Sequence, residues 1–314
     1  MSNFDYTRRD FLRTSTMAVG GCAAGIHGVQ AQQADADIPD ADELILKIGG
    51  VDKEFSFIHW TDAHLSECDQ RDEKLVKTLA KRAKVFGGNP TGVARGMVRQ
   101  FNALKPDLVA MTGDLLDVPT KKNIEIGAEI LKSIDSPSFF TMGNHEWCPP
   151  AVPPDRDYWR PRLRPMTEQS LDWHVQQFHG VNLLFVDDSN YQITEEQLRK
   201  TQKLLEDGRS CILFLHIPVA TESLVPSTVK RWGTPILLGA EGISANKRKH
   251  WGIGEGNEPS TAAFCKLVKT HPQVSAIFAG HIHIDHEGEY RQGCHQYVTG
   301  GGFEKRYRKV RVVS

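Results

Sequence analysis

The chain has 314 residues, of which 39% are hydrophobic and 25% are charged, and its formal net charge is −1 with histidine neutral. This near balance of charge gives no support for binding to nucleic acid or to a charged membrane surface. The length and apolar content suit one large α/β domain with a single core.

The N-terminus resembles an export signal. Residues 7–13 are TRRDFLR, a twin-arginine sequence, and an Ala- and Gly-rich apolar stretch follows to about Val29. Val29-Gln30-Ala31 is similar to a cleavage site of the A-x-A kind. We therefore predict a twin-arginine (Tat) signal peptide over residues 1–31, the Tat export machinery as a partner, and a periplasmic or extracellular mature chain. The stretch is too short and too weakly apolar for a stable membrane span.

Two alternatives stay open at this terminus. Cys22 follows Val19-Gly20-Gly21 and loosely resembles a lipoprotein site, so a lipid anchor is one of them. A disordered basic terminus is the other. Residues 32–48, acidic and Ala-rich at their start, are expected to form a linker, with one domain over residues 49–314.

Five short apolar runs are each followed at once by a polar cluster. Short apolar runs stopped by Gly, Asp or Asn are typical of buried strands. In open α/β sheets, sites form beyond the carboxyl ends of such strands, so polar clusters that are distant in sequence can meet there. The five predicted strands are Phe55–Ile58, Leu108–Met111, Phe139–Met142, Cys211–Leu215 and Val274–Phe278.

The polar clusters contain the residue types that two divalent metal ions need: carboxylates that can bridge, imidazoles, and a neutral oxygen. Any one cluster alone is explained by a strand-end cap or a turn. The ordered set predicts a two-metal site. In chain order the clusters are Asp62-Ala63-His64, Gly113-Asp114, Gly143-Asn144-His145-Glu146, His216 and Gly280-His281-Ile282-His283.

This ordered pattern resembles the calcineurin-like metallophosphoesterase superfamily, from about Lys53 to the C-terminus. The resemblance implies a four-layer αββα sandwich, in which two mixed β-sheets are flanked by helices. It also implies two metal ions that share Asp114. The first ion would be held by Asp62, His64, Asp114 and His283, and the second by Asp114, Asn144, His216 and His281.

The resemblance gives two further residues a role in catalysis. His145 would face the phosphate, where it stabilises phosphoryl charge or protonates the leaving oxygen. Asp117 resembles the family aspartate that orients this histidine. Two metals roughly 3.5–4 Å apart can clamp the attacking and leaving oxygens of an in-line displacement and supply hydroxide near neutral pH. The N and O ligands suit Mn, Fe, Zn or Co, and the choice among them stays open.

Departures from known branches narrow the expected substrate. Asp117 stands where purple acid phosphatases have a tyrosine ligand, and Val118 and Met142 stand where serine/threonine phosphatases have arginines. The second domain of the large 5′-nucleotidases is not expected after His283. We therefore expect a phosphodiesterase rather than a phosphomonoesterase, acting on a small-molecule or lipid phosphoester. A 5′-nucleotidase-like monoesterase and a non-catalytic metal-binding interaction module are the alternatives, and the complete ligand set favours an enzyme.

The remaining segments yield local predictions. Helices are expected over Glu195–Leu205, with Thr194 as N-cap, and over Ser260–Thr270. Strands are expected over Gly293–Val298 and Arg306–Val313, with a tight turn at Gly300-Gly301-Gly302 between them.

Three long segments, residues 66–95, 147–164 and 218–259, are candidates for shaping a substrate pocket. A solvated face is the expected setting of any single arginine there. An odd number of cysteines after the predicted signal argues against a full disulfide framework. Cys68 and Cys148 are expected to be two thiols, with a disulfide between them as the alternative. His59 and His286 are expected to be structural or to support a ligand.

Overall fold

The structure, a computed structural model, describes residues 38–151 and 153–314. The predicted signal over residues 1–31, with Cys22, and the first part of the predicted linker lie outside the described residues. None of the helices within the described ranges is long and apolar enough to cross a membrane.

The first sheet has five strands in the order β1-β11-β2-β3-β4. Its β11–β2 pair is antiparallel and the other pairs are parallel, so the sheet is mixed. Its strands are β1 Glu43–Lys47, β2 Phe55–Trp60, β3 Leu108–Thr112, β4 Ser138–Thr141 and β11 Arg308–Val313.

The second sheet has six strands in the order β5-β6-β7-β8-β10-β9. Three central pairs are parallel and the two outer pairs are antiparallel. Its strands are β5 Trp173–Phe178, β6 Val181–Val186, β7 Cys211–Phe214, β8 Val274–Ala279, β9 His286–Arg291 and β10 Cys294–Val298.

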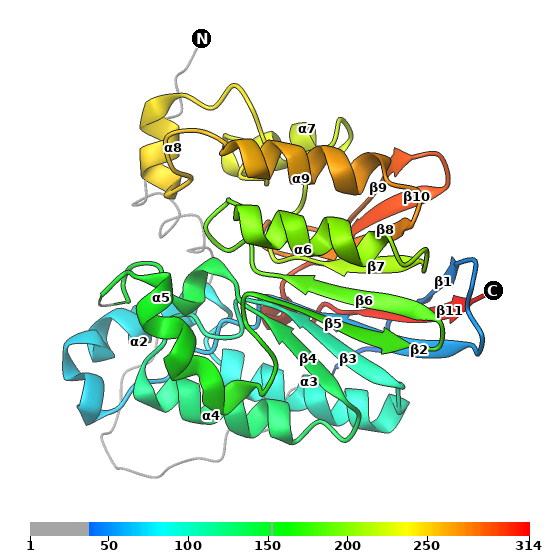
Figure 1. Cartoon of the computed structure of the whole chain (residues 1–314). Coiled ribbons are helices and arrows are strands. Elements are labelled where there is room, and N and C mark those ends of the chain that lie inside the picture. The colour runs from blue at the N-terminus through cyan, green and yellow to red at the C-terminus, as the bar shows by residue number, and fades with distance from the viewer. Residues whose placement is uncertain (1–37, 152) are drawn as a thin grey trace.

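Helices cover the outer faces of both sheets (Figure 1). Helices α3 and α4 pack on the first sheet, and α6 and α9 pack on the second. The α-helices are α2 Val76–Val85, α3 Pro90–Leu104, α4 Lys121–Lys132, α5 Arg156–Trp159, α6 Glu195–Leu205, α7 Leu224–Trp232, α8 Ala245–Trp251 and α9 Pro259–Thr270. Short 3-10 helices are η1 Gln70–Leu75, η2 Asn144–Glu146, η3 Arg160–Met166 and η4 Gly302–Glu304.

The two sheets stack face to face through an aromatic core. Phe57 of β2 lies edge-on to Phe214 of β7 and Phe278 of β8, with ring centroids 5.6 and 5.1 Å apart. All three side chains are fully buried. Strands covered on both faces need near-continuous apolar runs, which is the pattern that the sequence shows. The predicted four-layer αββα sandwich is therefore confirmed.

Most of the predicted elements form. The helix over residues 195–205 is confirmed, and the Thr194 hydroxyl accepts the backbone N–H of Gln197 as an N-cap. The predicted helix 260–270 begins one residue earlier, and Glu258 before it gives no side-chain cap. The predicted C-terminal strand begins two residues later than expected, at Arg308.

Two predictions are wrong in part. Residues Glu43–Lys47 fall in the predicted linker but form β1, which pairs in parallel with β11. Leu46 is buried while Ile45 is half exposed, the alternation of a strand at the edge of a sheet. The predicted tight turn is replaced by a segment that leads into η4, where the N–H groups of Gly302 and Phe303 donate to the backbone oxygens of Thr61 and Asp62, just after β2.

His59 of β2 lies between the sheets as a structural histidine. Its Nδ1 is 2.7 Å from Oγ1 of Thr299, and its Nε2 is 2.9 Å from Oγ1 of Thr112. Burial, reinforced by the positive charge of Arg308, lowers the pKa of His59 to about 3. The ring is therefore neutral in the folded protein.

We expect His59→Gln to make the free energy of unfolding less dependent on pH below pH 6.5. In the unfolded chain His59 binds a proton below its ordinary pKa of 6.5, whereas the folded ring does not until about 3. Its contribution to stability is therefore present above pH 6.5 and is lost as the pH falls towards 3. Each pH unit below 6.5 should cost the wild type up to about 1.4 kcal/mol that the variant does not lose. Denaturant unfolding of both metal-free proteins across this range measures the difference, and parallel curves would contradict it.

Candidate metal centre

The candidate ligands lie beyond the carboxyl ends of five strands. Asp62 and His64 follow β2, Asp114 follows β3, and Asn144 follows β4 as the first residue of η2. His216 follows β7, and His281 and His283 follow β8. The structure brings all seven residues to one end of the paired sheets, as expected from strand order.

Among the described residues, two groups of ligand atoms each contain three of the four ligands that the resemblance implies for one ion, and a further group joins His64, Asp114 and His145. The first group is Asp62, His64 and His283, and the second is Asp114, His216 and His281; within each, the ligand atoms lie within 4.8 Å of one another. Asn144 joins the second group, with Oδ1 3.1 Å from Nε2 of His216.

Asp114 lies between the two groups. Its Oδ2 is 3.3 Å from Nε2 of His216 and 3.8 Å from Nε2 of His64. Burial raises the pKa of Asp114, but the imidazoles of His216 and His145 lower it more, and the net pKa is well below the usual range. A carboxylate in this position can reach both groups at once.

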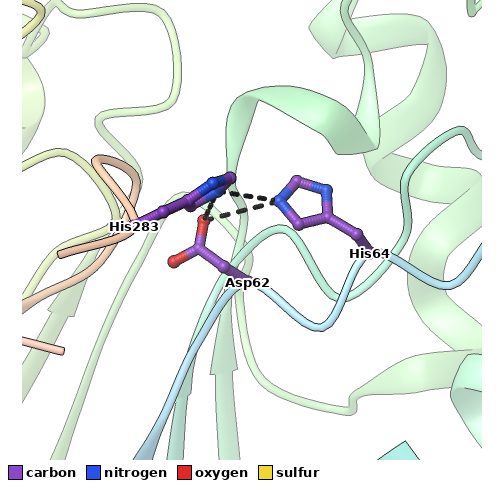
Figure 2. A group of neighbouring side chains, drawn as sticks. All are labelled: Asp62, His64 and His283. Carbon is purple, nitrogen blue, oxygen red and sulfur yellow. Dashed lines mark hydrogen bonds and ion pairs between the residues drawn. The ribbon is translucent and has the colours of Figure 1, made fainter. Parts of the chain in front are cut away.

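The first group has the geometry of ligands around one ion. Figure 2 shows Asp62, His64 and His283 pointing at a common space. The Nε2 atoms of the two histidines are 3.0 Å apart and lie 3.7 and 3.2 Å from Oδ1 of Asp62. Ligand atoms held 2.0–2.2 Å from one ion stand about 3 Å from each other. Oδ1 of Asp62 is buried and accepts no hydrogen bond, which is costly unless a cation meets it. The donor set therefore fits a divalent metal ion.

In the second group, the neighbours of His216 determine which of its ring nitrogens carries a proton and which faces the other ligands. Nδ1 of His216 lies 2.7 Å from the backbone oxygen of Thr112, which can only accept, so Nδ1 carries the proton and Nε2 faces Asp114. Burial lowers the pKa of His216, but Asp114 outweighs burial and raises the pKa to about 10. Metal binding at this group must therefore displace a proton.

The backbone itself is strained at the candidate ligands. Asp62, His64, Asp114, His281 and His283 all have φ between 50° and 68°, in the left-handed region that side chains other than glycine seldom adopt. Each such residue costs on the order of 1–3 kcal/mol, and such strain clusters at functional sites. A Cβ at Gly280 would collide with Thr61 and Asp62, so the last loop can approach β2 only with glycine there.

Glu146 holds the second and third loops together, a role that the sequence did not reveal. Its Oε2 accepts the N–H groups of Asp114 and Gly143 at 2.9 and 2.7 Å, and its Oε1 accepts that of Leu116 at 3.0 Å. Burial, with the nearby charge of Asp114, raises the pKa of Glu146 to about 7. The available indication was that Glu146 is the last residue of the cluster Gly143-Asn144-His145-Glu146.

The structure places Asp117 against His145. Nδ1 of His145 lies 3.0 Å from the backbone oxygen of Asp117 and 3.1 Å from its Oδ1. Both are acceptors, so Nδ1 carries the proton. Nε2 then faces the ligands, 4.0 Å from Oδ2 of Asp114. Burial lowers the pKa of His145, but Asp114 and Asp117 raise it above the ordinary value.

Arg82 of α2 is a second residue that sequence reasoning missed. Its Nε and Nη2 donate to the two carboxylate oxygens of Asp117, and Nη2 lies 3.3 Å from Nδ1 of His145. Phe86, four residues later, stacks on His64 with centroids 4.0 Å apart. The i, i+4 spacing of these two residues in the predicted pocket segment 66–95 was the available signal.

Other candidates take structural roles. Arg156 and Arg160 form ion pairs with the buried Asp187 at 3.4 and 2.7 Å, so the expectation of a solvated face is wrong for these two, as it is for Arg82. Cys68 and Cys148 do not form a disulfide with each other. Nε2 of His286 lies 3.2 Å from the backbone oxygen of Ser223, away from the ligands.

A family model described as calcineurin-like phosphoesterase matches residues 55–285, which contain every candidate ligand. The chain belongs to the calcineurin-like phosphoesterase family. It is a metal-dependent hydrolase of phosphoesters, and the two ligand groups suit the dinuclear chemistry of this family. No curated protein matches the sequence.

Several solved structures resemble this calcineurin-like phosphoesterase in fold. A dimetal phosphatase from Danio rerio is 13% identical, with 81% of this chain and 91% of that chain covered and a TM-score of 0.49. A purple acid phosphatase from yellow lupin (Lupinus luteus) seeds is 15% identical, with 81% and 45% covered and a TM-score of 0.47. A 5′-nucleotidase from Candida albicans is 13% identical, with 86% and 47% covered and a TM-score of 0.39. This chain thus spans less than half of the last two proteins.

We expect Arg82→Gln to lower kcat about tenfold or more while leaving metal binding unchanged, because Asp117 would lose the two donors that hold it against His145. Arg82→Lys should recover part of the loss. Arg95→Gln, which breaks an exposed ion pair with Glu129, is the matched control. Steady-state kinetics on a chromogenic phosphodiester, with metal content measured in parallel, test this. Wild-type kcat in Arg82→Gln would show that the arginine has no bearing on turnover.

Proposed function

We propose that this hydrolase prefers phosphodiesters to phosphomonoesters, with a small-molecule or lipid phosphoester as its natural substrate. The main support for this preference is the distribution of charge around His145. Arg82 is the guanidinium that lies against this histidine, and both oxygens of Asp117 already bind it. Its charge is therefore compensated. A monoester carries close to two negative charges at pH 7, while a diester carries one, and the diester needs less positive charge beyond the ions.

Aromatic rings around the first ligand group support the same preference. Phe303 lies 5.7 Å from His64 and 5.1 Å from His283, measured between ring centroids, and Trp232 lies 5.8 Å from His283. Phe303 and Trp232 are partly exposed and place apolar surface beside the ligands, whereas Phe86, which stacks on His64, is buried. Apolar surface suits the second ester substituent of a diester better than the charged, solvated oxygens of a monoester.

The residues of the chain divide the chemistry among them. Bound at the two groups, divalent ions would polarise phosphoryl oxygens and lower the pKa of water. Asn144 contributes a neutral oxygen, which limits negative charge facing an anionic substrate. His145, held by Asp117 at Nδ1, presents Nε2 to the substrate side and gives its proton to the leaving oxygen.

The test compares kcat/KM of the full chain, loaded with Mn²⁺, for bis(p-nitrophenyl) phosphate and p-nitrophenyl phosphate. We expect the diester to be preferred by about tenfold or more, a difference of roughly 1.4 kcal/mol in transition-state binding. His145→Ala should keep its metal and lose turnover of both substrates, which also excludes a contaminating phosphatase. His295→Ala, which changes an exposed histidine paired with Glu287, is the matched control and should behave as wild type.

Two results would contradict the proposal. A higher kcat/KM for the monoester would assign the chain to the 5′-nucleotidase-like alternative. Turnover of neither substrate by a chain with two bound metals would favour the non-catalytic binding module.

A further inference from the structure

Tyr191 reaches the candidate metal centre from the loop between β6 and α6. Its hydroxyl oxygen lies 2.8 Å from Nε2 of His281, 90 residues away in the chain. The side chain is buried, and its φ of 62° is in the left-handed region, which is rare for a bulky residue. The backbone strain thus occurs where the hydroxyl meets a candidate ligand, as it does at the ligands themselves.

The loop that carries Tyr191 also holds His216. Oδ1 of Asp188 accepts the backbone N–H of His216 at 3.0 Å, and the N–H of Tyr191 donates to the backbone oxygen of Asp188 at 2.7 Å. Trp147 anchors the loop from outside, because its Nε1 donates to Oγ of Ser189 at 2.9 Å. One short loop therefore fixes the backbone of one histidine in the second ligand group and the ring of the other.

The position of Tyr191 decides which nitrogen His281 offers. A neutral imidazole binds a metal through one nitrogen, and a hydrogen bond from the other N–H sets which one. Tyr191 occupies Nε2, so Nδ1 is the nitrogen that remains for the ligand group with Asp114 and His216. At His216 the nitrogens are reversed: the backbone oxygen of Thr112 accepts from Nδ1, so Nε2 is free to bind a metal. On this assignment the two rings would bind one ion through different nitrogens, each set by its own hydrogen-bond partner.

We propose that Tyr191 is a positioning residue for the ion held by Asp114, His216 and His281, with no corresponding role for the ion at Asp62, His64 and His283. When Nδ1 binds the ion, Nε2 carries the proton and donates it to the Tyr191 hydroxyl, which orients the ring and makes Nδ1 a better ligand. Loss of such a partner typically costs 10–100-fold in metal affinity. The inference rests on the metal dependence of the family and is separate from the preference for diesters.

The experiment is Tyr191→Phe in the full chain, which removes one oxygen atom and keeps the packing of the ring. Metal-free wild type and variant are titrated with Mn²⁺ by calorimetry in the absence of substrate. The wild type should bind two equivalents. In the variant the affinity of one equivalent should fall about 10–100-fold while that of the other stays within error. Tyr290→Phe is the matched control, since that hydroxyl donates to the backbone oxygen of Val274 at 3.0 Å and touches no candidate ligand.

Three results would overturn the inference: unchanged affinities in Tyr191→Phe, equal weakening of both equivalents, or a single equivalent in the wild type. Thermal unfolding of the metal-free proteins distinguishes a packing role from a positioning role. A lower Tm with unchanged metal affinities would mean that Tyr191 contributes to packing alone. The titration contains no substrate, so a failure here leaves the proposed diester preference untouched, and a preference for monoesters would leave this inference standing.

Discussion

Three buried carboxylates, Asp62, Asp114 and Asp117, set the constraint that the rest of the site satisfies, because a charge removed from water must be met by opposite charge and hydrogen bonds. Asp117 is satisfied within the chain by Arg82 and His145. Asp62 and Asp114 face imidazoles that must be neutral in order to bind metal. Two divalent ions are the partners that would balance these two carboxylates, and the strained loops around them serve to present the ligands.

The sandwich provides the rigid support that such loops need. Its sheets meet through large, fully buried rings such as Phe57 and Phe278, which leave the strand ends little freedom to shift. On that support Glu146 ties three backbone N–H groups from two loops to a single carboxylate. Packing and hydrogen bonding together offset the left-handed conformations at the ligands, whose cost would otherwise favour relaxed loops.

The sequence predicted the strands and the candidate ligands because both follow local rules: an apolar run, then a stop, then a residue of a type that can bind metal. It did not reveal Arg82 or Tyr191, whose partners are 35 and 90 residues away and depend on how separate loops fold back. Strand β1 was missed because its five residues sit beside an acidic, Ala-rich stretch and show only a brief alternation. The left-handed backbone conformations could not be predicted either. The preference of Asp and His for positive φ is too weak to be recognised from sequence alone, without knowing how the neighbouring strand ends pack.

The most direct test of the central claim is the anomalous difference map of a crystal of the full chain grown with Mn²⁺. Two peaks should appear roughly 3.5–4 Å apart with Asp114 between them. One should lie against Asp62, His64 and His283, and the other against Asn144, His216 and His281. A single peak, or two peaks that Asp114 does not join, would contradict the account.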